Sequence, residues 1–115
     1  MLDEYCQTVA HTISGEKVEV CCKRVCEVLN SMADWIAEHI RENEWITNKE
    51  GYSWFNGYYD NSGKAVEGDF ESGVRMMLTG QVFAIMSQTA TEEQVKEIVK
   101  AADKYLYDEA IGGYR

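Results

Sequence analysis

The chain has 115 residues, 45% of them hydrophobic and 27% charged, with a formal net charge of -9. This length suits one domain, 1–115, and the composition excludes a disordered chain. The acidic balance argues against a nucleic-acid partner and against an anionic membrane surface. No apolar run reaches the roughly 18 residues of a spanning helix, and the acidic N-terminus does not match a signal peptide, so we expect a cytoplasmic protein.

Two helices are predicted in the N-terminal part. The first covers Leu2 to about Ile13, and the pair Ser14-Gly15 suits its end. The second runs from about Lys17 to about Asn43, although residues 18–21 could equally be extended. Its apolar stripe recurs at three- and four-residue steps and consists of Val25, Leu29, Met32, Ile36 and Ile40.

The helical period disappears between Trp45 and Gly73, where glycine and aromatic residues accumulate. Trp54 to Tyr59 has strand-like composition, and Asp60-Asn61-Ser62-Gly63 is a turn sequence. Lys64 to Glu67 could pair back as a second strand. We therefore predict a short β-hairpin-like insertion near residues 52-67.

Two further helices are predicted after the glycine-rich region. The third runs from about Val74 or Arg75 to Ser87 and is apolar nearly all round, which predicts burial on most sides. The fourth begins at Thr91, where Thr91 and Gln94 form a capping box. The chain is therefore expected to be mainly α, with about four helices.

Metal-binding and catalytic patterns are weak. The four cysteines, Cys6, Cys21, Cys22 and Cys26, match no zinc spacing, and we expect small buried or half-buried thiols in a reducing compartment. Because the adjacent Cys21 and Cys22 would point to different sides of a helix, we expect at least one of these two to be exposed. His11 and His39 are expected to have solvated or capping roles. Carboxylate pairs such as Asp60 with Glu67, or Asp69 with Glu71, arise by chance among 20 acidic residues. We predict neither a metal nor a cofactor.

Residues 51–61 combine aromatic rings with Asn and Asp, and such a set can bind a sugar. A pyranose stacks its C–H face on an aromatic ring, while its hydroxyls pair with planar amides or carboxylates. Hairpin packing is the more common role of such aromatics, and composition alone favours it.

Several segments have a residue order that helix, strand and turn patterns alone do not explain. They are residues 14–20 (SGEKVEV), 55–68 (FNGYYDNSGKAVEG), 73–87 (GVRMMLTGQVFAIMS), 101–108 (AADKYLYD) and 112–115 (GGYR). In this order they resemble glycoside hydrolase family 94, formerly glycosyltransferase family 36, on its cellobiose and cellodextrin phosphorylase side. The chain departs from that pattern at Ala84, where a proline is expected, and at Gln88, where a glycine is usual.

The resemblance implies an inverting β-glucoside phosphorylase, which transfers a glycosyl group to inorganic phosphate and releases α-glucose 1-phosphate. It also implies that this chain is part of an (α/α)6 barrel catalytic domain. The family's general acid lies in a Trp-Asp-Asn-Asp-like motif, and its phosphate-binding segment is of Lys-Glu-Asn-Gly type. This sequence contains neither motif, so we assign no catalytic residue and expect the chain alone to be inactive.

Position beside the irregular segment makes Phe55, Asn56 and Arg75 the residues expected near the sugar. The partner of the intact enzyme would be a β-linked gluco-oligosaccharide, with inorganic phosphate as its co-substrate. The isolated chain is expected to self-associate, because the third helix needs neighbours that four helices do not all supply. The alternative is a non-catalytic small helical module that binds a protein or a glycan.

Overall fold

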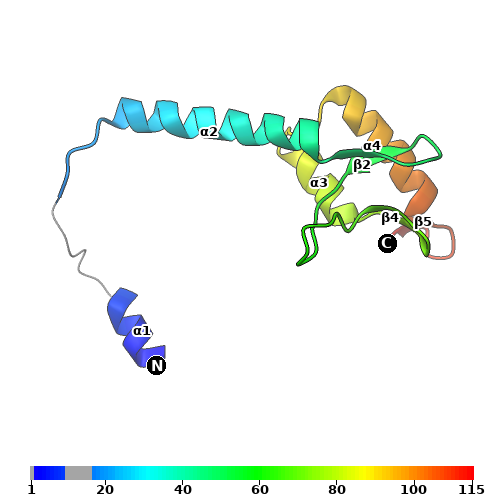
Figure 1. The fold of residues 1–115 in the computed structure, drawn as a ribbon, viewed down its shortest axis with the longest axis horizontal. Helices are drawn as coiled ribbons and strands as arrows, with labels where there is room; N and C mark the ends of the chain where they lie inside the picture. The colour runs from blue at the N-terminus through cyan, green and yellow to red at the C-terminus, as the bar shows by residue number, and fades with distance from the viewer. Residues whose placement is uncertain (1, 10–16) are drawn as a thin grey trace.

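The computed structural model describes residues 2–9 and 17–115. Its helices are α1 (Leu2–Val9), α2 (Cys22–Asn43), α3 (Leu78–Met86) and α4 (Glu92–Tyr105). Figure 1 shows α2 projecting from a smaller packed unit made by the later elements. No helix in the described part of the chain is long and apolar enough to cross a membrane.

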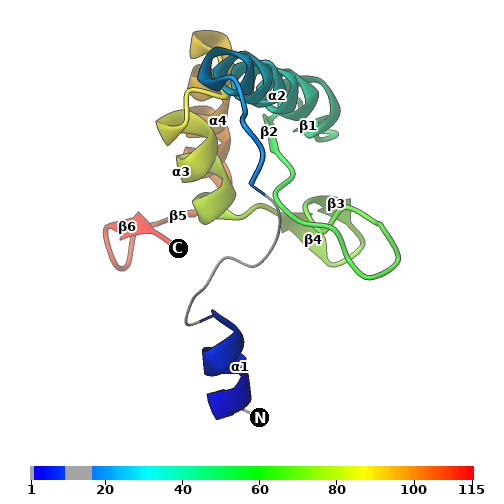
Figure 2. The same cartoon turned by 90° about the vertical axis from the view of Figure 1, so that its left-hand side faces the viewer.

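Six short strands form three separate two-stranded antiparallel sheets among the described residues. The pairs are β1 (Trp45–Thr47) with β2 (Ser53–Phe55), β3 (Gly68–Phe70) with β4 (Gly73–Arg75), and β5 (Tyr107–Asp108) with β6 (Gly113–Tyr114). Figure 2 shows the β3–β4 hairpin standing to one side of the helices.

The expected fold class is wrong. The described chain is a small mixed α/β structure, with helices and three strand pairs, and not a mainly-α portion of a four-helix barrel wall. The third helix was expected to start at Val74 or Arg75, but both residues belong to β4. Gly73 has φ 112°, a conformation that L-residues rarely adopt, and this turn sends the chain back along β3 before α3 begins.

The predicted hairpin near residues 52-67 has a different strand pairing. β2 pairs with the preceding β1, in the register Trp45 opposite Phe55. Asn48 makes this reversal, because its side-chain oxygen accepts the backbone N–H groups of Glu50 (3.0 Å) and Tyr52 (2.9 Å). The predicted turn at 60–63 does form, but its flanks contribute only an isolated bridge between Tyr59 and Ala65.

The first predicted helix is confirmed over Leu2–Val9, and its remainder, with Ser14-Gly15, lies outside the described residues. Helix α2 begins at Cys22, so the extended alternative holds for residues 18–21. The capping box of α4 is confirmed, since the Thr91 side chain accepts from Gln94 N and Gln94 reciprocates.

The core lies where α4 packs on β2. Trp54 and Ala101 are 0% exposed, and Ile98 is 2% exposed. The small side chains of Ala101 and Ala102 let the indole of Trp54 approach the helix closely. Tyr105 ties the hairpin to α4, because its hydroxyl accepts from Asn48 Nδ2 at 2.7 Å and its ring packs against that of Trp54 at 5.9 Å.

Two burial predictions are wrong. Helix α3 was expected to be buried on most sides, but its buried residues are Gln81 and Ala84, whereas Phe83 and Met86 are exposed. Apart from the exposure expected for one of Cys21 and Cys22, the cysteines were expected to be buried or half-buried, but all four thiols are free and exposed. For α3 the physical cause is that the described chain does not cover its apolar face.

Candidate functional site

A groove lies where the end of α2, the residues after β2 and helix α3 meet. Its volume is about 560 Å³, within the range of roughly 300–1,000 Å³ typical of small-molecule sites. Its lining combines apolar side chains, Ile40, Phe83, Ala84 and Met86, with polar ones, Glu44, Asn56, Tyr59, Ser87 and Thr89. Such a mixed lining matches a ligand with both a flat apolar face and hydroxyl groups.

Glu44 is the centre of the polar part of the groove lining. Its Oε2 accepts a hydrogen bond from the Tyr59 hydroxyl at 2.7 Å and one from Asn56 Nδ2 at 3.1 Å. The backbone reinforces this, because Asn56 N donates to Glu44 O at 2.8 Å. The hydrogen bond to Glu44 raises the pKa of the Tyr59 phenol. The three groups therefore form one connected network at the groove rim.

Asn56 is held from two directions. It is 5% exposed, and its Oδ1 accepts from Glu67 N at 3.3 Å while its amide nitrogen donates to Glu44. The side-chain amide is thus oriented by its hydrogen bonds, with oxygen toward Glu67 and nitrogen toward Glu44.

Glu67 is a buried carboxylate that binds backbone. It is 3% exposed, and its two oxygens accept from Gly57 N and Met77 N, each at 2.8 Å. Burial raises the pKa of Glu67, whereas the two amide donors act to lower it. The carboxylate therefore joins the loop after β2 to the start of α3.

Gln81 fixes the other side of the same loop. It is 1% exposed, and it exchanges two hydrogen bonds with the backbone of Phe55: Phe55 N donates to Oε1 at 2.9 Å, and Nε2 donates to Phe55 O at 2.8 Å. This pair continues the β1–β2 ladder onto the side chain of a helix. Two side chains, Gln81 and Glu67, therefore hold the backbone of residues 55–57 in place through hydrogen bonds.

Gly57 lies where the chain after β2 comes close to helix α3. A Cβ on Gly57 would lie 3.1 Å from Glu67 Oε1, which is tighter than an ordinary contact, and 3.8 Å from the Cα of Gly80. A Cβ on Gly80 would meet ordinary contacts, at 3.7 Å from the Cα of Gly57. The close fit therefore favours glycine at position 57.

The structure separates the three residues expected near a sugar. Phe55 and Asn56 line the groove, although Phe55 is 3% exposed and mostly belongs to the core. Arg75 lies in β4, where its guanidinium sits 4.5 Å from the centre of the Phe70 ring and Nη2 donates to Ser72 Oγ at 3.2 Å. Arg75 therefore anchors the β3–β4 hairpin.

The other sequence candidates do not assemble a reaction centre. Asp60 accepts the N–H groups of Ser62 and Lys64 within its own turn, and Asp69 accepts Lys49 N at 2.8 Å. His39 stacks on Trp35 with ring centres 5.0 Å apart, while His11 lies outside the described residues. Within 2–9 and 17–115, no group of three or more His, Cys, Asp or Glu residues is placed to hold a metal ion.

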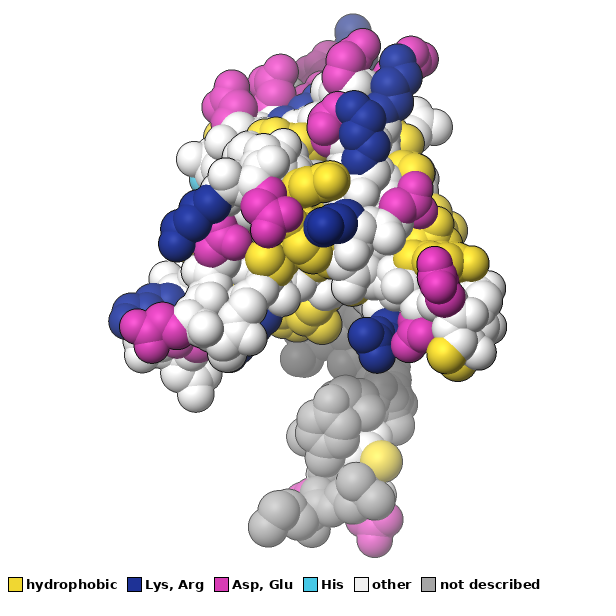
Figure 3. All heavy atoms as spheres, turned by 90° about the vertical axis from the view of Figure 1, so that its right-hand side faces the viewer, with side chains coloured by type: hydrophobic (Ala, Val, Ile, Leu, Met, Phe, Trp, Pro, Cys, Tyr) yellow, Lys and Arg dark blue, Asp and Glu magenta, His cyan; other side chains and the backbone are white. Residues whose placement is uncertain are grey.

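No model of a known protein family matches this chain, and no curated protein matches it. The site is therefore interpreted from its own geometry. Figure 3 adds that acidic and basic side chains are interspersed on the face it displays, with hydrophobic side chains exposed between them. That face has no continuous basic surface of the kind that nucleic-acid phosphates require.

Sequence reasoning missed Glu44 and Gln81. It named Tyr59 only within the stretch 51–61, and it named Glu67 only as a chance carboxylate pair with Asp60. One signal was available for Gln81: it is a lone amide in a strongly apolar helix, and a polar group there must find a partner if it is buried. Glu44 and Glu67 gave no such signal, since each is one of 20 acidic residues.

Proposed function

We propose that this chain is part of an inverting β-glucoside phosphorylase of the cellobiose and cellodextrin type, and that it forms one wall of the sugar pocket. Such an enzyme transfers a glycosyl group to inorganic phosphate and releases α-glucose 1-phosphate. The observation that carries the proposal is the groove at Asn56, whose lining combines apolar and polar side chains. The sequence segments that resemble family 94 support it, and a cytoplasmic location is part of it.

The groove lining suits a sugar ring for two physical reasons. The ring of Phe83 is 65% exposed and offers a face for the C–H groups of a pyranose. The Glu44 carboxylate in the same lining can accept sugar hydroxyls, since an ionised carboxylate has about four lone-pair sites and only its Oε2 accepts from Tyr59 and Asn56. In this proposal Phe83 is the stacking surface and Glu44 the hydroxyl acceptor.

The chemical step needs groups that this sequence does not contain. A glycosidic bond breaks when a carboxylic acid protonates the leaving oxygen while the nucleophile attacks from the opposite face. In the family that this chain resembles, phosphate is that nucleophile, and the acid lies in the motif missing here. The isolated chain is therefore expected to release no glucose 1-phosphate from cellobiose or cellodextrins, and dose-dependent release by pure protein would contradict this.

A segment exchange tests the family assignment directly. Residues 1–115 replace the matching segment of an active family 94 cellodextrin phosphorylase, and phosphate-dependent release of glucose 1-phosphate is measured. Retained activity is the expected result. A chimera that folds and binds phosphate but has no activity, beside an active parent enzyme, would contradict the proposal.

Sugar binding by the chain itself is the second test. Saturation-transfer NMR with cellotriose should give a signal that weakens several-fold in Phe83→Ala, because the stacking surface is removed. Arg75→Ala is the matched control, since Arg75 lies in the β3–β4 hairpin. Equal loss in both variants, or no signal with the parent chain, would count against a sugar groove.

The alternative function is a non-catalytic module that binds a protein or a glycan. The exposed apolar face of α2 favours a protein-binding version of it. The segment exchange distinguishes the two functions, because a binding module has no reason to restore phosphorolysis.

A further inference from the structure

Asn56 and Gly57 form the only Asn-Gly pair in the sequence, and both residues line the groove directly after β2. Asparagine is a thermolabile residue. A following glycine makes it most labile, because no Cβ hinders the approach of the next backbone nitrogen to the side-chain amide. The contacts that the fold gives these two residues therefore decide whether Asn56 keeps its amide.

The reaction joins two groups that are adjacent along the chain. The backbone nitrogen of Gly57 gives up its proton and forms a bond to Cγ of Asn56. The bond from Cγ to Nδ2 breaks, and Nδ2 leaves with that proton as ammonia. Water then opens the resulting succinimide ring at either carbonyl carbon, which gives an aspartyl or an isoaspartyl residue at position 56. The net change takes up one water and releases one ammonia, without oxidation or reduction.

The attacking nitrogen is held by Glu67. Gly57 N donates to Glu67 Oε1 at 2.8 Å, and this carboxylate is 3% exposed. The proton that the reaction must remove is therefore engaged with a buried acceptor, in surroundings where a hydrogen bond is stronger than in water. An ionised Glu67 also opposes the negative charge that the nitrogen must develop, because like charges close together repel.

The side-chain amide of Asn56 is held at both of its ends. Nδ2 donates to Glu44 Oε2 at 3.1 Å, and Oδ1 accepts from Glu67 N at 3.3 Å. The side chain is 5% exposed. Attack on Cγ turns this planar carbon tetrahedral, which moves Oδ1 and Nδ2 out of their plane. Ring closure must therefore disturb both hydrogen bonds in addition to the one at Gly57 N.

The same contact explains why glycine occupies position 57. A Cβ there would lie 3.1 Å from Glu67 Oε1, which is tighter than an ordinary contact. A larger residue would slow ring closure by its own bulk, but it would also push the carboxylate away from the backbone nitrogen. The close fit thus combines the most labile type of pair with the contact that protects it.

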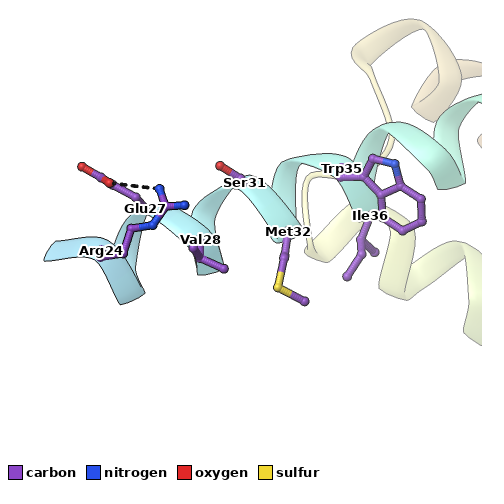
Figure 4. A pocket seen from close by; sticks show the side chains of 7 residues that line it. All are labelled: Arg24, Glu27, Val28, Ser31, Met32, Trp35 and Ile36. Carbon is purple, nitrogen blue, oxygen red and sulfur yellow. Dashed lines mark ion pairs between the residues drawn. The ribbon is translucent and has the colours of Figure 1, made fainter. Parts of the chain in front are cut away.

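Glu67 is better placed than Glu44 to provide this protection. Glu67 bonds the backbone of Gly57 and the side chain of Asn56, and its Oε2 accepts from Met77 N at 2.8 Å. Glu44 is the C-cap of α2, a helix supported only near its C-terminal end. Figure 4 shows four of its exposed apolar side chains, Val28, Met32, Trp35 and Ile36.

We propose that Asn56 is a latent site of spontaneous deamidation, which Glu67 keeps closed in the folded chain and which opens when the backbone of residues 55–57 separates from Glu67. Local opening of this kind costs less free energy than complete unfolding. After the amide is lost, a carboxylate stands where Nδ2 donated to Glu44, and the two negative groups repel. Deamidation therefore changes the groove permanently, whatever ligand the groove binds.

Peptide mapping by mass spectrometry tests the closed state. The full chain is incubated at one mildly alkaline pH, either folded or unfolded in guanidinium chloride, and then digested with trypsin. Fragment spectra of the peptide 50–64 locate the mass gain of the amide-to-acid conversion at Asn56. We expect the folded chain to react at least about tenfold more slowly, since several hydrogen bonds must open first. Equal rates in the two states would overturn the proposal.

Two variants test the role of Glu67. Glu67→Gln removes one of its two acceptor oxygens and its charge, and it should raise the rate at Asn56 about fivefold in the folded chain. Ile98→Val is the matched control, because it shortens a core side chain outside the groove lining and should lower stability by a similar amount. Its rate should change less than about twofold, since local opening and not complete unfolding exposes the site.

The two variants are compared only where both are folded. Circular dichroism checks the fold, and urea unfolding checks that their losses of stability match. Equal acceleration in Glu67→Gln and Ile98→Val, or no acceleration in Glu67→Gln, would overturn the proposal. If Glu67→Gln does not fold, the comparison of the folded and unfolded native chain still decides it. The result does not depend on sugar binding, so the proposed function and the deamidation site can fail separately.

Discussion

Helices α2 and α4 are both amphipathic, yet their apolar faces have opposite environments. In α4 the apolar face packs on β2, with Ile98 2% exposed and Ala101 0% exposed. In α2 the equivalent face is open, with Leu29 58% and Trp35 64% exposed. Amphipathic spacing therefore shows which face of a helix needs a partner, but it does not show whether the same chain supplies that partner.

A second difference concerns polar groups. The packed unit contains three side chains that are nearly inaccessible and fully engaged, Asn56, Glu67 and Gln81, and each bonds to backbone of another segment. The polar residues of α2 other than Arg41 are exposed. The described bonds of α2 to other elements come from the half-buried Arg41, which donates to the carbonyls of Thr89 and Gln88. The packed unit is thus stabilised by its own residues, whereas α2 is fixed only near its C-terminal end.

The largest expected effect comes from exchanging the two tryptophans for alanine. Trp54→Ala should cost about 3–5 kcal/mol of the free energy of unfolding, because it empties the centre of the core. Trp35→Ala should cost less than about 0.5 kcal/mol in dilute solution, since that indole is 64% exposed. Urea unfolding followed by near-ultraviolet circular dichroism measures both free energies. Similar losses in the two variants would contradict the difference in packing between the core and α2.

Gln81→Leu is expected to have the next largest effect. The substitution leaves Phe55 N and Phe55 O buried without these partners. In the native protein Phe55 N donates to Gln81 Oε1 at 2.9 Å, and Phe55 O accepts from Gln81 Nε2 at 2.8 Å. The expected loss is about 2–3 kcal/mol by urea unfolding. Thr79→Ala, at an exposed position of the same helix, is the control and should be near neutral.

Glu67→Gln should cost about 1 kcal/mol through the loss of one amide hydrogen bond, and it should also change the pH dependence of stability. Burial raises the pKa of Glu67 above its ordinary value of 4.5, so the folded state binds more protons than the unfolded state. Stability from this group is therefore present below the unfolded pKa and is lost as the pH rises through the folded pKa. Relative to Glu67→Gln, the native chain should lose stability from pH 4 upward, and a difference that is flat or rises with pH would contradict a raised pKa.

The smallest expected effect is a gain in the free energy of unfolding. Gln88 has φ 60° just after the end of α3, a left-handed conformation that glycine adopts without the Cβ penalty. Gln88→Gly should stabilise the chain by about 0.5–1 kcal/mol, because the Arg41 bond uses the backbone carbonyl of residue 88 and survives the change. A loss of stability, measured by thermal unfolding, would show that the Gln88 side chain contributes a contact of its own.

Sequence reasoning placed two residues that line the groove near a sugar. It selected Phe55 and Asn56 for their position at the irregular segment and for their residue types, and both line the groove. It also selected Arg75, which lies in β4 and binds Phe70 and Ser72. Proximity along the chain identified the first pair, whereas the position of Arg75 depended on the tight reversal at Gly73.

By itself the sequence determined the features that depend on neighbours along the chain. The capping box at Thr91 and the turn at Asp60 follow from side chains that bond backbone two to four residues away. The apolar stripe of α2 follows from helical period. Each of these is a local preference, and each appears in the structure as the residues predict.

Only the tertiary structure decided the strand pairing and the burial of each face. Both β1 and the segment at 64–67 were available as pairing partners of β2. β2 pairs with β1, where Asn48 closes the shorter loop, and Gln81 binds the backbone of Phe55 on the edge of β2 that faces away from β1. The apolar faces of α2 and α3 could have been inside or outside, since burial is a sum over all neighbours that the chain brings together. In this protein the apolar face of α4 is buried against β2, whereas the apolar face of α2 is exposed, because the described chain places no other segment against it.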